Sequence, residues 1–333
     1  MALLEVTDLN VHFQTFDGAV RAVNGLSFSI EPSETVAIVG ESGSGKTVTS
    51  LSILRLLASP PARITGSIKF NGVNLLDLSK KEIRRLRGGD ISMVFQEPMT
   101  SLNPVLTVGR QIDETLMLHQ GLSREAARKR AIELLRLVGI PAPERRITGY
   151  PHQFSGGMRQ RVMIAMALAC SPKLLIADEP TTALDVTIQA QVLGLMRELR
   201  QQLRSAIMLI THDLGIVAEM ADRVIVMYAG SAIEQAGVRE LFTTPRHPYT
   251  RGLLNSVPKL GSSLASGGRQ PLNEIRGVVP SLRKDIVGCA FAPRCERATQ
   301  VCREVKPVNR EVAPSHFAAC HHPVGIDDLV GVR

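Results

Sequence analysis

Short apolar runs alternate with longer segments of helical periodicity along the first 245 residues of the chain. Each run would be apolar on both faces of an extended backbone, which is typical of strands buried in a parallel sheet with helices on its two sides. Strands and helices in this alternation predict an α/β fold. The runs that predict buried strands most clearly are 35–39, 90–95, 174–177 and 206–210.

The region before the first of these runs has a different pattern. Residues 3–13 and 20–30 are rich in Val, Leu, Ile and Phe and predict two β segments separated by a short turn. Further along, residues from about 98 to 160 are more charged and show more helical periodicity. Within them Ser123 precedes the run 124–138, whose apolar positions fall on one helical face. We therefore expect a helical subdomain carried on the α/β core.

The composition and the hydrophobic pattern change again beyond residue 245. Proline, glycine and serine become frequent and the periodicity fades. We expect a boundary near this point, with an α/β domain over 1–245 and a small, irregular, cysteine-containing domain over 246–333.

Composition narrows the class of protein. The chain has 333 residues, no Trp and a formal net charge of +8. Lys and Arg are scattered, so the charge is interpreted as solvated surface with some attraction to a membrane face, and no nucleic-acid partner is expected. The N-terminus lacks the pattern of a signal peptide, and the longest apolar run, 162–170, is too short to cross a bilayer. These features predict a soluble, cytoplasmic protein that reaches a membrane through its partners.

A glycine-rich loop stands between the apolar run 35–39 and an expected helix at 48–54. This is the context in which G-x-x-x-x-G-K-[ST] binds the phosphates of a nucleotide, because the loop directs its N–H groups into one concavity at the positive end of the helix. Lys46 would reach the β- and γ-phosphates, and the Thr47 hydroxyl would ligate Mg²⁺. The alternative is a flexible strand-to-helix turn. The loop comprises Gly40, Glu41, Ser42, Gly43, Ser44, Gly45, Lys46 and Thr47.

Two carboxylates follow the apolar run 174–177, at the strand end where α/β folds place their ligands. Asp178 is expected beside Thr47 in the Mg²⁺ shell. Glu179 is then placed to orient or deprotonate the attacking water. Without a phosphate loop upstream, an acidic pair at a strand end is commonly a helix cap or a turn.

Together with a glutamine loop, a signature motif, a D-loop and a switch histidine in the family's order, these features make the first 245 residues resemble the nucleotide-binding subunit of an ABC transporter, a P-loop NTPase. The resemblance implies ATP and Mg²⁺ as cofactors and ATP hydrolysis as the activity. Lys46, Glu179 and His212, the switch histidine, would be the catalytic residues, and Asp185 would belong to the D-loop. The plain alternative for His212 is a satisfied histidine at a strand end.

The same resemblance assigns two further roles. Gln96, the centre of the glutamine loop, would bind Mg²⁺ with Thr47 and Asp178; otherwise it is an ordinary polar residue at a strand end. Phe13 would stack on adenine, with Phe16 as its substitute. The alternative for Phe13 is an aromatic side chain in the core of a strand.

The signature motif implied by the resemblance runs from Phe154 to Met158 and departs from the commonest Leu-Ser-Gly-Gly-Gln at both ends. Ser155, Gly156 and Gly157 remain, so a phosphate contact through a hydroxyl and a helix N-terminus survives. In this family the signature of one subunit closes over the nucleotide of another. The chain therefore needs a second ABC ATPase subunit; two ATP molecules would close the dimer, and hydrolysis would reopen it.

Three segments narrow the resemblance. Residues 97–104 and 246–250 are similar to the dipeptide/oligopeptide/nickel importer group, and 181–191 looks most like the dipeptide or oligopeptide branch. The implied partners are a non-identical ATPase homologue, two membrane permeases and an extracytoplasmic solute-binding protein. The implied location is the cytoplasmic face of the membrane, as a peripheral subunit.

Other readings of the same motifs are open. The alternative within the group is import of nickel or another small solute. A soluble ABC ATPase acting on nucleic acid or ribosomes belongs to another class, but such proteins usually carry two nucleotide domains or long insertions. A GTPase switch lacks support because no Asn-Lys-x-Asp motif occurs.

Four of the five cysteines lie close to the C-terminus, separated by five, six and seventeen residues. Four thiolates can hold an iron–sulfur cluster or a tetrahedral zinc, and free buried thiols are the third alternative. The resemblance favours a [4Fe–4S] cluster, since some members of the importer group carry one at the C-terminus. His316, His321 or His322 could replace a ligand. The cysteines are Cys289, Cys295, Cys302 and Cys320.

Overall fold

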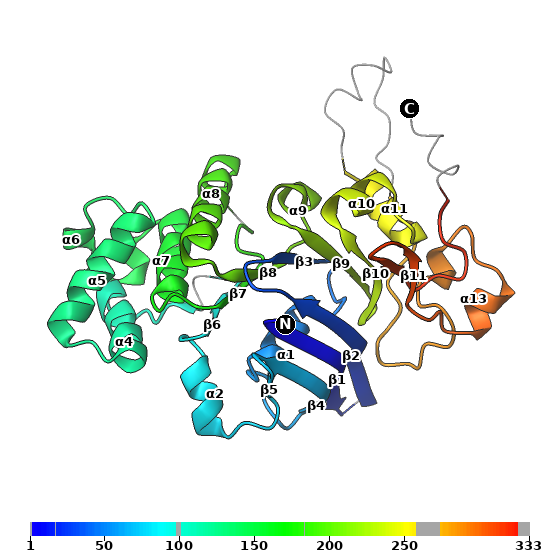
Figure 1. Ribbon diagram of the computed structural model, residues 1–333, viewed down its shortest axis with the longest axis horizontal. Coiled ribbons are helices and arrows are strands. Elements are labelled where there is room, and N and C mark those ends of the chain that lie inside the picture. The colour runs from blue at the N-terminus through cyan, green and yellow to red at the C-terminus, as the bar shows by residue number, and fades with distance from the viewer. Residues whose placement is uncertain (1, 17, 98–100, 183, 258–273, 326–333) are drawn as a thin grey trace, which may run out of the picture.

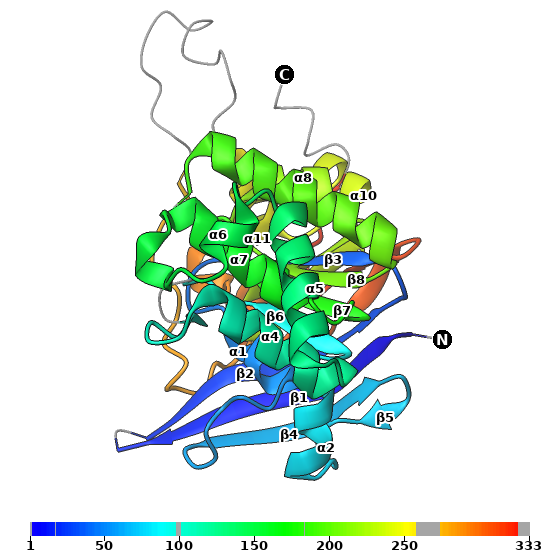
Figure 2. The same cartoon turned by 90° about the vertical axis from the view of Figure 1, so that its left-hand side faces the viewer.

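The computed structural model describes residues 2–16, 18–97, 101–182, 184–257 and 274–325. The first residues of the expected helical subdomain, 98–100, lie outside these ranges. The described elements form two sheets and a separate group of helices, with the small sheet below the large one and the helical group to one side (Figures 1 and 2).

The small sheet is antiparallel and holds the N-terminal segments. Its order is β2-β1-β4-β5, and β1 pairs with β2 on one side and with β4 on the other. Apolar residues at alternating positions are buried against the large sheet. The two predicted β segments are thus confirmed. The strands are β1 (Leu4–Thr15), β2 (Gly18–Ile30), β4 (Ala62–Phe70) and β5 (Val73–Asn74).

The large sheet has the order β11-β12-β10-β9-β3-β8-β7-β6. Its five strands from β9 to β6 are parallel, and β3 lies between β9 and β8. The carboxyl ends of these strands therefore lie at one edge, where the ligands of α/β folds bind. The strands are β3 (Thr35–Val39), β6 (Ile91–Val94), β7 (Leu174–Asp178), β8 (Ala206–Ile210), β9 (Arg223–Tyr228) and β10 (Ser231–Gly237).

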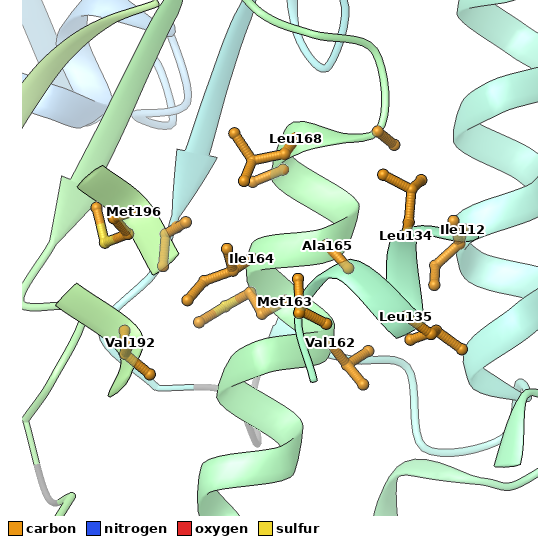
Figure 3. Close-up of a cluster of buried hydrophobic side chains, with 14 of the residues drawn as sticks. Ile112, Leu134, Leu135, Val162, Met163, Ile164, Ala165, Leu168, Val192 and Met196 are labelled. Carbon is orange, nitrogen blue, oxygen red and sulfur yellow. The ribbon is translucent and has the colours of Figure 1, made fainter. Parts of the chain in front are cut away.

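The predicted helical insertion forms a group of its own. Ser123 caps its longest helix, accepting a hydrogen bond from the Ala126 backbone N–H, because a serine oxygen can satisfy an otherwise unpaired donor of the first turn. Aliphatic side chains around α7 form the core of this group (Figure 3). The helices are α4 (Val108–Gln120), α5 (Arg124–Leu137), α6 (Pro143–Arg146), η1 (Pro151–Gln153) and α7 (Gly156–Leu168).

The remaining helices of the first 245 residues border the sheets. Helix α1 follows β3, and α8 follows β7 (Figure 1). None of the helices among the described residues is long and apolar enough to cross a membrane. These helices are α1 (Lys46–Ile53), α2 (Lys80–Leu86), α8 (Val186–Leu203), α9 (Leu214–Met220) and α10 (Val238–Thr243).

The C-terminal segment is irregular, as predicted, but it joins the large sheet. Strand β12 pairs with β10, with Ala318 opposite Glu234. A third apolar cluster packs β9, β10 and α11 against Phe291. The division near residue 245 stays a prediction. The elements of this segment are α11 (Pro248–Asn255), η2 (Ala292–Arg294), α13 (Gln300–Glu304), β11 (Arg310–Ala313) and β12 (His316–Ala318).

Candidate active site

The glycine-rich loop joins the end of β3 to the start of α1. Gly40 and Gly45 have backbone φ angles of 154° and 98°, in a range that residues other than glycine rarely adopt. A Cβ atom on Gly40 would lie 2.2 Å from the Met227 carbonyl oxygen, and one on Gly45 would lie 2.4 Å from the Ala22 carbonyl oxygen. Glycine is required at both positions because the loop runs against the backbone of its neighbours.

Lys46 is the first residue of α1 and is 6% exposed. Its Nζ donates to the carbonyl oxygens of Gly40 at 2.7 Å and Glu41 at 3.0 Å. Burial lowers the pKa of Lys46, while the carboxylates of Glu179 and Asp178 oppose this shift. The ammonium is therefore held against the loop, where an anionic phosphate can take over its hydrogen bonds.

The residues predicted to hold Mg²⁺ are only partly brought together. Thr47 Oγ1 donates to Asp178 Oδ1 at 3.2 Å, which places a hydroxyl and a carboxylate side by side. Oxygen donors of these two kinds suit Mg²⁺. Burial raises the pKa of Asp178, which is 1% exposed. Gln96, in contrast, donates through Nε2 to Glu179 Oε2 at 2.9 Å.

Glu179 is the centre of a second group of contacts. Thr182 Oγ1 donates to Glu179 Oε2 at 2.9 Å, and His212 Nδ1 lies 3.2 Å from Glu179 Oε1. Burial raises the pKa of Glu179, but the hydrogen bonds from Thr182 and His212 outweigh burial and hold the pKa below its ordinary value. The side chain is thus a hydrogen-bonded carboxylate beside the phosphate loop, a group that can orient water or accept its proton.

The backbone of Glu179 is strained. Its φ angle is 46°, in the left-handed region, and its N–H donates to the Ile210 carbonyl oxygen at 2.8 Å. Such a conformation costs on the order of 1–3 kcal/mol for a residue other than glycine. Strain of this kind is typical of functional sites, where it fixes the direction of one side chain.

The signature residues lie on the helical group, at the N-terminus of α7. Ser155 is the N-cap and accepts the Met158 N–H at 3.4 Å, and a Cβ on Gly156 would meet open space. No hydrogen bond or ion pair within the described ranges joins Ser155, Gly156 or Gly157 to the phosphate loop. Asp185 likewise caps α8, accepting the Ile188 N–H at 2.9 Å.

The two phenylalanines proposed for adenine differ in burial. Phe13 lies on β1, is partly buried and packs against the core between the two sheets. Phe16 is fully exposed. Stacking of either ring on adenine stays a prediction.

Comparisons with known proteins decide the family. Residues 23–182 match the model described as ABC transporter, and residues 233–302 match the model described as oligopeptide/dipeptide transporter, C-terminal region. The chain is 57% identical over 319 residues to a probable peptide ABC transporter ATP-binding protein of Sinorhizobium fredii, covering 96% of this chain and 94% of that protein. It is 54% identical over 316 residues to the oligopeptide transport ATP-binding protein OppD of Bacillus subtilis, covering 95% and 87%.

The chain belongs to the ABC transporter ATP-binding proteins.

Solved structures agree with this. The dimeric structure of MJ0796, a bacterial ABC transporter cassette, matches with a TM-score of 0.64 and 29% identity, covering 71% of this chain and 99% of that chain. The structure of cbiO1 from Clostridium perfringens matches with a TM-score of 0.60 and 31% identity, covering 72% and 90%. The ABC-type fold and the ATPase activity predicted from the sequence are thus confirmed.

The cysteines of this ABC ATPase do not form a metal site in the structure. Cys289, Cys295, Cys302 and Cys320 line one cavity of about 10 Å³, together with His321 and His322. This volume suits about one water-sized particle, whereas a [4Fe–4S] cluster has eight atoms. Burial raises the pKa of Cys289, Cys295 and Cys320, the last to about 11, so these thiols are neutral unless a metal binds and displaces their protons.

No group of three or more His, Cys, Asp or Glu side chains in the described part of the chain is arranged to hold a metal ion. The iron–sulfur and zinc predictions therefore stay predictions: four cysteines share one cavity, but they are not arranged as metal ligands. The predicted substitute ligand His316 is instead engaged elsewhere: its Nε2 lies 2.7 Å from Glu234 Oε1, and both side chains are buried.

Sequence reasoning missed three residues that touch the ATP site. Thr182 donates to Glu179, and its position three residues after the carboxylate could have been noticed as a local pattern. Tyr249 and Arg294 contact Glu41 of the phosphate loop. Tyr249 stood in a segment used only for the resemblance, and no signal along the chain pointed to Arg294.

Proposed function

We propose that this chain is the ATP-hydrolysing subunit that energises import of dipeptides or oligopeptides by an ABC transporter. The support is the similarity to proteins named for peptide transport, at 50–57% identity over nearly the whole chain. That similarity includes the C-terminal segment, whose matching family model is itself described as oligopeptide/dipeptide transporter. Relatives named for peptide transport favour this reading over nickel import and over a soluble ATPase acting on nucleic acid.

In the proposed mechanism, the phosphate loop binds the triphosphate of ATP and Lys46 turns from the loop carbonyl groups to the β- and γ-phosphates. Thr47 and Asp178 would hold Mg²⁺, which would neutralise charge on the phosphates. Glu179 orients the attacking water and accepts its proton, while His212 holds the γ-phosphate. Gln96 donates to Glu179 in the structure and would have to leave this contact to bind Mg²⁺.

The signature residues act on the nucleotide of a second ATPase subunit. This proposal is supported by the position of Ser155 at an exposed helix N-terminus with open space beside Gly156, because such a terminus can receive a phosphate from outside the chain. Asp185 would lie at the same interface. We propose a non-identical ATPase homologue as the partner, with two permease subunits and an extracytoplasmic solute-binding protein, and a peripheral position on the cytoplasmic face of the membrane.

Uptake of labelled solutes tests the proposed function. In cells that lack this chain, uptake of labelled dipeptide and of a longer peptide should be lost, restored by the wild-type gene and not by Lys46→Ala. The reason is that Lys46 is the buried cation of the phosphate loop, and its removal takes away the charge that holds the triphosphate.

The same assay includes nickel as the competing solute. Nickel uptake lost with peptide uptake intact would move the chain to the metal branch. The ratio of short to long peptide uptake would assign the length of the imported peptide.

The iron–sulfur cluster remains a second proposal, supported by the resemblance and by the convergence of Cys289, Cys295, Cys302 and Cys320 on one cavity. Those side chains would have to move apart to receive it. We expect iron and acid-labile sulfide in an anaerobically purified chain, at about four of each per chain. Absence of iron and sulfide would refute the proposed cluster, and one bound zinc per chain would indicate a zinc site in its place.

A further inference from the structure

Glu41, the second residue of the phosphate loop, is held through three of its polar groups. Its backbone N–H donates to Tyr249 Oη at 3.0 Å, and its carboxylate pairs with Arg294 Nη1 at 2.8 Å. Its carbonyl oxygen accepts from Lys46 Nζ at 3.0 Å. The first two partners lie 208 and 253 residues further along the chain. One residue thus connects the C-terminal segment with the lysine of the ATP site.

Arg294 is fixed in place by its own contacts. Its side chain is 5% exposed. Nε donates to the Arg276 carbonyl oxygen and Nη2 to the Ile275 carbonyl oxygen, both at 2.9 Å. The guanidinium carbon lies 5.8 Å from the centre of the Tyr228 ring and 6.0 Å from that of Phe291. A buried, planar cation held on all sides is preorganised for one carboxylate.

Tyr249 is equally constrained. Its side chain is fully buried, and its ring packs against Phe291 with 5.4 Å between ring centres. It stands in the first turn of α11. The start of that helix is anchored by Glu234 of β10, whose carboxylate accepts the N–H groups of Arg246 at 2.6 Å and His247 at 2.9 Å. The hydroxyl that meets the phosphate loop is therefore tied to the large sheet.

The charge of Glu41 explains why such contacts matter. Its carboxylate lies close enough to Lys46 to act on the ammonium electrostatically. Without a counter-charge, this carboxylate would compete with the triphosphate for Lys46 and repel the phosphates, since buried or half-buried charges are weakly screened. Arg294 supplies the counter-charge, and Tyr249 keeps the loop backbone in place.

We propose that Arg294 and Tyr249 are positioning residues of the ATP site, through which the C-terminal segment sets the affinity of the phosphate loop for ATP. The proposal rests on ATP binding at this loop and is independent of peptide import.

Titration of the full-length chain with the fluorescent analogue MANT-ATP tests the proposal. Arg294→Gln should weaken binding about tenfold, because the lost contact is a charge-assisted pair and leaves the Glu41 carboxylate unneutralised. The double variant Glu41→Gln/Arg294→Gln should bind severalfold more tightly than Arg294→Gln, since no carboxylate is then left unneutralised. Arg294→Lys should retain most of the affinity. A purely structural role of Arg294 predicts instead a double variant at least as weak as the single one.

Tyr249→Phe tests the second contact separately. It keeps the ring and removes the hydroxyl, and should weaken MANT-ATP binding about fivefold, the effect of one neutral hydrogen bond. Arg303→Gln is the matched control: Arg303 is exposed in the same C-terminal segment, and its variant should bind like wild type.

Two results would overturn the proposal: wild-type affinity in Arg294→Gln and Tyr249→Phe, or failure of Glu41→Gln to rescue Arg294→Gln. If Arg294→Gln does not fold, as judged by its melting temperature, Tyr249→Phe decides, and wild-type affinity in that variant would then refute the proposal. A wild-type chain that does not bind MANT-ATP would refute the ATP site itself.

Discussion

Replacing Glu179 by glutamine is expected to lower the rate of ATP hydrolysis at least 100-fold while ATP still binds. The Glu179 carboxylate is ionised and hydrogen-bonded to Thr182 and His212, so it is ready to accept a proton from water. The glutamine amide has the same shape and can still form hydrogen bonds, but it cannot act as a base. Loss of a general base typically costs about 10²–10⁴ in rate.

The measurement is single-turnover hydrolysis of radiolabelled ATP by the chain assembled with its partner ATPase and permeases. Size-exclusion chromatography with ATP and Mg²⁺ should show a persistent ATPase dimer, since bound ATP is no longer consumed. Glu5→Gln, at an exposed position on β1, makes the same chemical change and should hydrolyse ATP like wild type. Hydrolysis by Glu179→Gln at the wild-type rate would show that another group activates the water.

The second large effect is expected at Asp178. Asp178→Asn should abolish Mg²⁺-dependent hydrolysis, with a loss of at least about 100-fold, because it removes the carboxylate that lies beside Thr47 and can hold the metal. Thr47→Ser keeps the hydroxyl and should retain most of the activity. Full activity of Asp178→Asn at low Mg²⁺ concentration would refute the assigned role.

Asp178→Asn should also leave the nucleotide-free chain at least as stable as wild type above pH 5. Burial raises the pKa of Asp178 over its value in the unfolded chain, so the folded chain loses stability as pH rises through the ordinary range for aspartate and above it. Asparagine does not pay this desolvation cost. Melting temperatures at pH 5 and pH 8 check this; a variant that is less stable at pH 8 would contradict it.

Local patterns were sufficient for the framework of the ATP site. The runs 35–39 and 206–210 coincide with β3 and β8, because short, mostly apolar runs favour a strand covered on both faces. Ser123 marked the start of α5, since capping is decided within one turn. The helix N-terminus expected at the signature motif is that of α7, because Ser155 caps the helix ahead of the two glycines.

Contacts between distant segments of the chain were harder to predict from the sequence. The C-terminal strands β11 and β12 extend the large sheet, although the sequence suggested only an irregular tail, because the short strand β12 is stabilised by pairing with β10 rather than by a pattern of its own. For the cysteines, spacing along the chain could not reveal the size of the space between them, and the cavity is smaller than a cluster requires.

By itself, the sequence determined the local features to which the chemistry is assigned: a phosphate loop between a strand and a helix, and an acidic pair at the end of a neighbouring strand. These are local features, and their backbone conformations depend on residues within a few positions. Only the tertiary structure decided how Gln96, Glu179 and His212 meet, and that Glu41 is held by Tyr249 and Arg294. The physical reason is that a hydrogen bond or ion pair acts over about 3 Å in space, and separation along the chain does not predict that distance.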